Sequence, residues 1–127
     1  MAQGPIKALC TQGTFTPSSN STKSLTGQCQ WYRIGNWVYL SCAIWTSGSD
    51  SSSDAFHLNI PFNIANQRAY GVVGYSALSA SKPNLHMVGV GATKYLAMEY
   101  GGGGAVTQVT RNEISTFQFS IVYITDG

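Results

Sequence analysis

Charged side chains are scarce in this 127-residue chain. Lys, Arg, Asp and Glu make up only 9% of the residues, against about a quarter in an ordinary soluble domain. The net charge is +2 at pH 7 and the seven basic residues never cluster, which excludes an electrostatic nucleic-acid surface. The polar residues are instead Ser, Thr, Asn, Gln and Gly, which hydrogen-bond well but cause little repulsion between copies. Such surfaces suit close-packed assemblies.

Long apolar runs are missing as well. No stretch approaches the length of a membrane span, and the first ten residues lack the apolar segment of a secretory signal peptide. We therefore expect no membrane insertion, and synthesis in a cytoplasm. No window has the period of an amphipathic helix, which excludes parallel architectures built from strand–helix–strand units.

Groups for acid–base chemistry are few. Five acidic residues and two histidines are scattered along the chain, whereas catalysis needs two or more such groups together. Asp50 and Asp54 lie in a Ser-rich segment, 47–54, that we expect to be an exposed, flexible loop; solvated charges are the simpler interpretation and a weak calcium site is the alternative. His57 and His86 are expected to be half-buried strand residues, since neither has ligands at metal-site spacing. The sequence therefore predicts no enzyme, no metal and no cofactor.

Cysteines are also few, and their number is odd. The chain has three, and none of them forms a CxxC metal or redox motif. We therefore expect free thiols. Cys42 falls on the apolar side of its strand and should be buried as a small hydrophobic residue. A disulfide between Cys10 and Cys29 remains open as an alternative.

Alternation of apolar and other side chains is the pattern that the sequence does have. Residues 32–45, YRIGNWVYLSCAIW, predict two strands joined at Gly35-Asn36, because Gly and Asn accept the positive φ of a primed hairpin turn. After the turn one face is wholly apolar, and the other carries Trp37, Tyr39 and Trp45. A sheet in a small monomer normally leaves one face polar. A second apolar face therefore indicates contacts with a partner.

Similar patterning recurs along the whole chain and predicts an all-β protein. The expected strands cover 11–16, 29–34, 37–46, 57–61, 69–78, 85–92, 93–100, 105–110 and 114–125. Glycines in the strand at 69–78 predict a bulge or a close neighbour, with Tyr70 and Tyr75 on opposite faces. Gly101 to Gly104 are expected to form a mobile hairpin tip, since a phosphate-binding loop needs a following helix and a lysine. The predicted architecture is an antiparallel β-sandwich of jelly-roll type with roughly nine strands.

Aromatic side chains raise the main question about function. They combine a large apolar area with low side-chain entropy, which suits both a platform for sugar rings and a subunit interface. Ordinary sandwich core is expected for at least half of them. The candidate interface or glycan-stacking residues are Trp31, Trp37, Trp45, Tyr95 and Tyr100.

Four segments occur in the order found in a recurrent bacteriophage virion surface domain, the type present at tail-fibre tips and in capsid decoration proteins. The segments are GTFTP at 13–17, WYRIGNWVY at 31–39, LNIPF at 58–62 and the closing strand at 117–125. The chain resembles this family over most of residues 13–125. These motifs are strand and turn signatures, so they specify the fold better than the role, and no catalytic or binding residues come with them.

The resemblance implies a trimeric β-sandwich displayed on a phage particle, which agrees with the low charge and the doubly apolar hairpin. The chain departs from the fibre pattern at its start, where we expect an attachment arm at 1–12, no long shaft, and a β-sandwich domain at 13–127. We therefore expect a non-enzymatic virion structural protein that binds other capsid or tail proteins, either a trimeric capsid decoration protein (cement or head fibre) or a short tail-fibre component. The alternative is a receptor-recognition tip that binds a carbohydrate of the host surface through exposed aromatic rings.

Overall fold

The computed structural model describes residues 10–65, 67–78, 82–102 and 105–126, and these form an all-β, antiparallel fold. Within those ranges there are nine strands and no helix, so the described residues contain no helix that crosses a membrane. The strands are β1 Cys10–Phe15, β2 Ser24–Ile34, β3 Trp37–Ser47, β4 His57–Asn59, β5 Ala69–Ser76, β6 His86–Gly89, β7 Tyr95–Gly102, β8 Ala105–Gln108 and β9 Phe117–Ile124. The predicted all-β, antiparallel class with roughly nine strands is confirmed.

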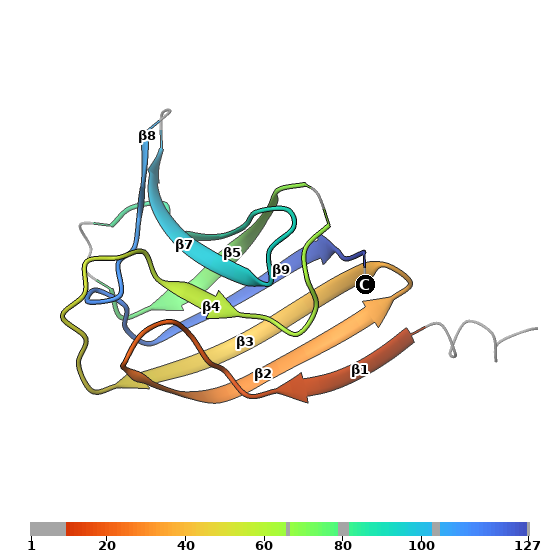
Figure 1. Ribbon diagram of the computed structural model, residues 1–127, viewed down its shortest axis with the longest axis horizontal. Helices are drawn as coiled ribbons and strands as arrows, with labels where there is room; N and C mark the ends of the chain where they lie inside the picture. Colours follow the sequence, from red (N-terminus) through yellow and green to blue (C-terminus); the bar gives the residue numbers. More distant parts are fainter. Residues whose placement is uncertain (1–9, 66, 79–81, 103–104, 127) are drawn as a thin grey trace, which may run out of the picture.

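All nine strands belong to one sheet that curls over itself. The order of neighbours is β1-β2-β3-β9-β5-β6-β7-β4, and β8 pairs with the end of β7. Figure 1 shows β1, β2, β3, β9 and β5 side by side, while β7 and β4 cross in front of them. The result is a curled half-barrel. Its core lies between the five-stranded part and the strands that fold over it.

The hairpin of β2 and β3 is the longest pairing in the sheet. Ile34 pairs with Trp37 across a two-residue turn, and Gly35 has a φ of 58°, as a primed turn requires. The predicted hairpin is confirmed, although β2 begins at Ser24 rather than at Cys29. The additional residues, SLTGQ, have only one large apolar side chain, so the alternation that reveals the rest of the strand is absent there.

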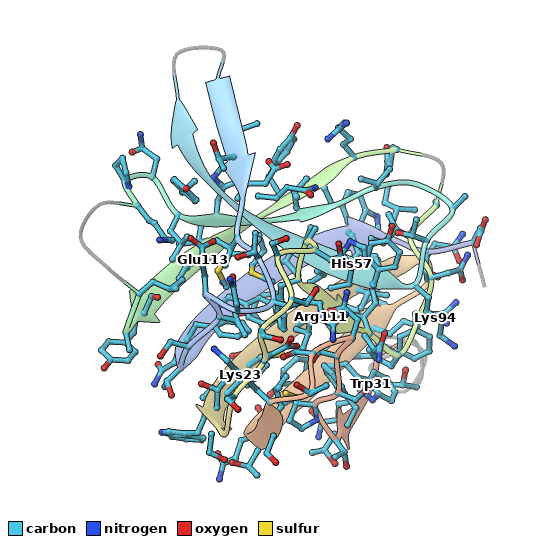
Figure 2. The ribbon with its side chains drawn as sticks, turned by 60° about the vertical axis from the view of Figure 1, so that its left-hand side comes forward. Lys23, Trp31, His57, Lys94, Arg111 and Glu113 are labelled. Atoms are coloured by element: carbon cyan, nitrogen blue, oxygen red, sulfur yellow. The ribbon has the colours of Figure 1, made fainter. Side chains whose placement is uncertain are left out.

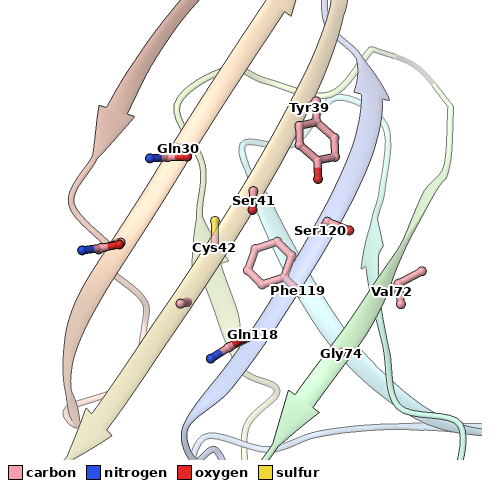
Figure 3. A pocket seen from close by; sticks show the side chains of 11 residues that line it. Gln30, Tyr39, Ser41, Cys42, Val72, Gly74, Gln118, Phe119 and Ser120 are labelled. Carbon is pink, nitrogen blue, oxygen red and sulfur yellow. The ribbon is translucent and has the colours of Figure 1, made fainter.

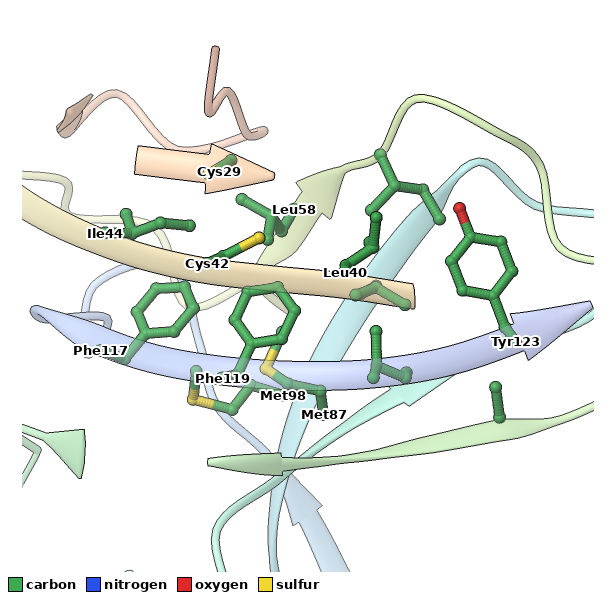
Figure 4. Packing of buried hydrophobic residues seen from close by; sticks show 14 of the residues in the cluster. Cys29, Leu40, Cys42, Ile44, Leu58, Met87, Met98, Phe117, Phe119 and Tyr123 are labelled. Atoms are coloured by element: carbon green, nitrogen blue, oxygen red, sulfur yellow. The ribbon is translucent and has the colours of Figure 1, made fainter. Parts of the chain in front are cut away.

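Apolar residues from both parts of the sheet fill the core. Phe117, Phe119, Ile121 and Tyr123 of β9 are buried, as the sequence predicts for one face of this strand. Figure 4 shows Phe117, Phe119 and Tyr123 in the core with residues of β3, β4 and β7, which include Leu40, Ile44, Leu58 and Met98. The Tyr123 hydroxyl donates a 2.8 Å hydrogen bond to the Phe62 carbonyl oxygen. Burial raises the pKa of this phenol, so the hydroxyl stays protonated.

The three cysteines are free thiols, as predicted, and Cys42 is buried. The alternative of a Cys10–Cys29 disulfide is wrong. Cys10 pairs with Ile34 whereas Cys29 pairs with Phe15, so the two cysteines lie at opposite ends of the β1–β2 ladder. A disulfide needs Cα atoms within about 7 Å of each other, and a ladder of this length separates them by more than twice that distance at about 3.3 Å per residue.

The predicted bulge in β5 is confirmed, but its effect on side-chain direction was not foreseen. The register against β9 shifts between Val73 and Tyr75. The extra residue places Tyr70, Val72 and Tyr75 all in solvent, so the expectation that Tyr70 and Tyr75 oppose each other is wrong. The predicted close neighbour is present at Gly71, where a Cβ atom would lie 2.6 Å from the Ser120 carbonyl oxygen.

Two other predictions concern the ends of elements. Residues 1–9 of the predicted arm lie outside the described residues, and residues 10–12 pair with β2 as the start of β1. The glycine tip joins β7 and β8, which pair as far as Gly102 and Ala105. Residues 103–104 of the tip are outside the described ranges, and its mobility remains a prediction.

Candidate interaction surface

The face of the five-stranded part that is turned away from the core carries most of the exposed apolar side chains. Among the described residues ten large apolar side chains are exposed, and eight of them belong to β2, β3, β5 and β9. We call these eight the outer face: Ile34, Trp37, Tyr39, Trp45, Tyr70, Val72, Tyr75 and Val122. Their exposed fractions range from 39% to 68%.

Strand pairing groups four of these side chains at one end of the outer face. Ile34 of β2 and Trp37 of β3 are direct cross-strand partners. Tyr39, two residues further along β3, pairs with Val122 of β9. The ring of Tyr32 lies 5.9 Å from that of Tyr39 and extends the same row onto β2. Because β2, β3, β9 and β5 are consecutive neighbours, the eight side chains share one side of the sheet, with Ser41 and Ala43 separating Tyr39 from Trp45 along β3.

A shallow hollow of about 390 Å³ opens within the outer face. Figure 3 shows it between β2, β3, β9 and β5, with Tyr39 and Val72 on its rim. Its polar lining consists of amides and hydroxyls, from Gln28, Gln30, Ser41, Gln118 and Ser120. These groups are neutral and can both donate and accept hydrogen bonds.

Among the described residues, none that forms the outer face or lines its hollow has an ionised side chain. His86, the cross-strand partner of Val72, borders this face together with Glu99. Arg33, which lies on the edge hairpin, is directed to the other side of the sheet. Its guanidinium lies 5.0 Å from the centre of the Phe62 ring, and its Nε donates to the Gly35 carbonyl oxygen at 2.8 Å. The patch can therefore be covered without desolvating a charge.

The structure places two of the five aromatic candidates from the sequence on the same face, at opposite ends of β3. Trp37 and Trp45 both belong to the outer face. Trp31 is half-buried on the core side, where its ring meets that of Phe62 edge-on at 5.0 Å (Figure 2).

The remaining two candidates lie on β7, in the layer that folds over the core. Tyr95 stacks on His57, with ring centres 4.0 Å apart. Tyr100 packs against the core, and the Lys82 ammonium group lies 5.4 Å from the centre of its ring. Neither belongs to the outer face.

Residues that the candidate list omitted complete the outer face. Tyr39 and Val122 alternate with buried neighbours and were detectable by periodicity, whereas Tyr75 was assigned to the wrong side because the bulge at Gly74 reverses the alternation. Tyr70 and Val72 lie before that bulge on the same strand. Only the pairing of β5 with β9 shows that they join the patch.

The two histidines are half-buried strand residues, as expected. Burial lowers the pKa of His57, which favours its neutral form. His86 pairs with Glu99 across β6 and β7, with its Nε2 3.2 Å from the Glu99 Oε1 atom. This carboxylate could not be foreseen from local pattern, because the pairing of β6 with β7 places it beside His86. No group of three or more His, Cys, Asp or Glu residues suited to a metal ion is found in the described ranges.

Asp50 is not the solvated loop charge that the sequence predicts. Its side chain is only 3% exposed, and four donors surround it. The Ser21 hydroxyl (2.8 Å), the Thr22 backbone N–H (2.9 Å) and the Arg111 Nε (3.0 Å) donate to one carboxylate oxygen, while the Ser52 backbone N–H (2.9 Å) donates to the other. These bonds, with that from Ser52 foremost, hold the pKa of the Asp50 carboxyl well below its usual range.

The Asp50 carboxylate joins three loops at one end of the molecule. Lys23 reinforces this junction by donating to the carbonyl oxygens of Asn112 (3.1 Å) and Ile114 (2.6 Å), and Figure 2 shows Lys23 and Arg111 there. The donors already occupy the Asp50 oxygens that a calcium ion would need. The arrangement is that of a structural anchor.

Replacing Asp50 with Asn is expected to lower the midpoint of thermal unfolding at pH 7 by several degrees, because the charge-assisted bonds are lost. A carboxyl with a depressed pKa stabilises the fold fully above its unfolded pKa, about 4, and this contribution disappears as the pH falls through the folded pKa. The wild type should therefore lose more stability than D50N between neutral pH and pH 2, as measured by thermal unfolding. Asp54→Asn, an exposed residue of the same loop, is the control; an equal loss in both variants would contradict the anchor.

Comparisons with known proteins give one structural likeness. No family model matches the chain, and no curated protein matches it either. The fold is similar to part of the Dettilon tailspike protein, with a TM-score of 0.69 and 15% sequence identity. The match covers 91% of this chain and 24% of the tailspike chain. At that identity the likeness establishes the fold, and the fold is therefore one that also occurs within a tailspike protein.

Proposed function

We propose that the protein is a non-enzymatic structural protein of a bacteriophage virion, a homotrimer whose copies meet through the outer face. The observation that carries the proposal is the gathering of eight exposed, uncharged apolar side chains on one side of the sheet. The fold likeness to a tailspike domain supports a role on a phage particle. The motif resemblance in the sequence supports both that location and the number of copies.

The size of the outer face fits a subunit interface. Large aromatic side chains each offer roughly 150–250 Å² of surface, and these residues are about half exposed, so the patch presents on the order of 800 Å². One partner in a standard protein–protein interface contributes about 800 Å². A lone subunit would leave all eight side chains in water.

The place of the trimer on the particle is part of the same proposal. We place it as a capsid decoration protein or a short tail-fibre component, with residues 1–12 attaching it to another capsid or tail protein. The resemblance that implies the trimer also implies a β-sandwich of jelly-roll type, and the two layers of the curled sheet agree with that type.

Analytical ultracentrifugation tests the proposed assembly. Sedimentation at micromolar concentration is expected to give a single species with three times the mass of one chain. A stable monomer under those conditions would refute the interface. Locating the domain in a cryo-EM map of the intact particle then distinguishes capsid from tail, and its absence from the particle would refute the virion role.

A second candidate function is recognition of a host carbohydrate, and the hollow in the outer face favours it. Its amides and hydroxyls suit the hydroxyl groups of a neutral sugar, and the adjacent Tyr39 ring suits stacking on a sugar face. One surface cannot be both free for a glycan and covered by another subunit. A monomer that binds a glycan array through Tyr39, and loses the signal in Tyr39→Ala, would favour this candidate; no signal from the wild type removes it.

A further inference from the structure

Cys29 and Cys42 face each other across β2 and β3. They are direct partners in the register, and Figure 4 shows them on the two neighbouring strands. Pairs in an antiparallel ladder alternate between hydrogen-bonded and non-hydrogen-bonded, and the pair that flanks a two-residue turn is hydrogen-bonded. The Cys29–Cys42 pair lies five positions along the ladder from the Ile34–Trp37 pair that flanks the turn. Because five is odd, it is a non-hydrogen-bonded pair, with Cα atoms about 4.5 Å apart. Disulfides span Cα distances of about 4.4–6.8 Å.

Both thiol side chains point into the core, where Cys29 is 2% exposed and Cys42 is 4% exposed. The neighbouring Cys29 thiol and burial raise the pKa of the Cys42 thiol, so it is protonated at neutral pH. Because the two residues are direct partners in the register, a bond between their sulfurs needs no large movement of the backbone.

A groove gives small molecules a route to Cys29. The pairing of β1 with β2 ends at Phe15 and Cys29, which leaves the side of β2 open beyond this point. A groove of about 640 Å³ lies there, lined by the segment from Thr14 to Pro17 and by β2 from Leu25 to Gln30, including Cys29.

We propose that Cys29 and Cys42 form a redox site that closes a cross-strand disulfide when the protein meets a low-molecular-weight disulfide as oxidant. The Cys29 sulfur, having lost its proton to solvent, attacks the oxidant and releases one small thiol; the Cys42 sulfur then displaces the second small thiol from Cys29. Two protein S–H bonds are lost, one S–S bond forms, and the oxidant is reduced to two thiols. The inference depends on the strand register and not on the proposed function.

The link would join two strands on either side of a turn and restrict the unfolded chain, which stabilises the fold. A reducing cytoplasm keeps such thiols reduced, and an oxidising environment allows them to pair. The same protein would thus have an open form during synthesis and a locked form outside a cell.

The test uses the Cys10→Ser variant, which removes the exposed third thiol. After incubation with oxidised glutathione, the folded variant is expected to lose both titratable thiols and to have a mass lower by two hydrogen atoms. Peptide mapping should link residues 29 and 42, the midpoint of thermal unfolding should rise, and dithiothreitol should reverse all of these changes. In the matched control, with Ser also at position 42, neither the mass loss nor the rise in midpoint should occur.

Other outcomes overturn the proposal. Both thiols surviving in the folded variant, a stable glutathione adduct without ring closure, or a link only between chains would each show that the pair does not form a redox site. Closure that occurs only in denaturant would also overturn it, because the folded register would then play no part.

Discussion

Replacing Gly27 with Ala is expected to lower the free energy of unfolding by about 4 kcal/mol. Gly27 has a φ of +139°, which side chains rarely adopt, and an added Cβ atom would lie 2.0 Å from the Ala43 carbonyl oxygen. That oxygen belongs to the backbone of β3, so the clash is relieved only if β2 moves away from its partner. Folded domains are stable by only about 5–15 kcal/mol. Urea unfolding measures the change.

Gly35→Ala is the matched control for this prediction. Gly35 also has a positive φ, 58°, yet a Cβ atom there would meet nothing within 4 Å. Its replacement costs only the strain of the left-handed conformation, about 1–2 kcal/mol. Equal losses in the two variants would mean that the contact with Ala43 contributes nothing.

Replacing Val122 with Lys is expected to weaken assembly about a thousandfold while leaving the subunit folded. Val122 lies on β9 beside Tyr39, inside the outer face, and is 48% exposed in a single subunit. The ammonium group stays in water in the free chain, but it has no partner once the surface is covered. An unpaired charge in a buried contact costs about 3–5 kcal/mol, and 1.4 kcal/mol is tenfold in a dissociation constant. Sedimentation of the variant over a dilution series measures the shift, and circular dichroism confirms the fold.

Val106→Lys is the control, since Val106 is similarly exposed, at 55%, but lies on β8 away from the outer face. This variant should assemble like the wild type. If V122K remains fully assembled, or if both variants dissociate, the outer face is not the interface.

Local pattern was sufficient to predict much of the fold. The Gly35-Asn36 turn and the alternation around it fixed the β2–β3 hairpin and its faces, and the aromatic alternation in 117–123 identified the central core strand. The bulge was also foreseen, but its consequence for Tyr75 was not. A single extra residue reverses the direction of every later side chain, and only pairing with β9 shows where it occurs.

Contacts between distant segments could not be predicted. Asp50 appears solvated in its Ser-rich segment because its partners are remote: Ser21 is 29 residues away and Arg111 is 61. The carboxylate beside His86 likewise depends on the β6–β7 register. The choice of the five aromatic candidates failed for a similar reason, because residue type alone does not distinguish Trp31, which lies on the core side, from Trp37, which lies on the surface. Strand pairing and burial together made that distinction.

The neutrality of the outer face affects the conditions under which subunits would stay together. Ionic screening acts on charges, and this surface has none to screen, so dilute and concentrated salt should give nearly the same affinity. Sulfate should strengthen the contact, and cooling should weaken it, because both act on the hydration of apolar groups. An assembly held in this way would tolerate the wide range of salinity found in natural waters, and would be more sensitive to cold than to brine.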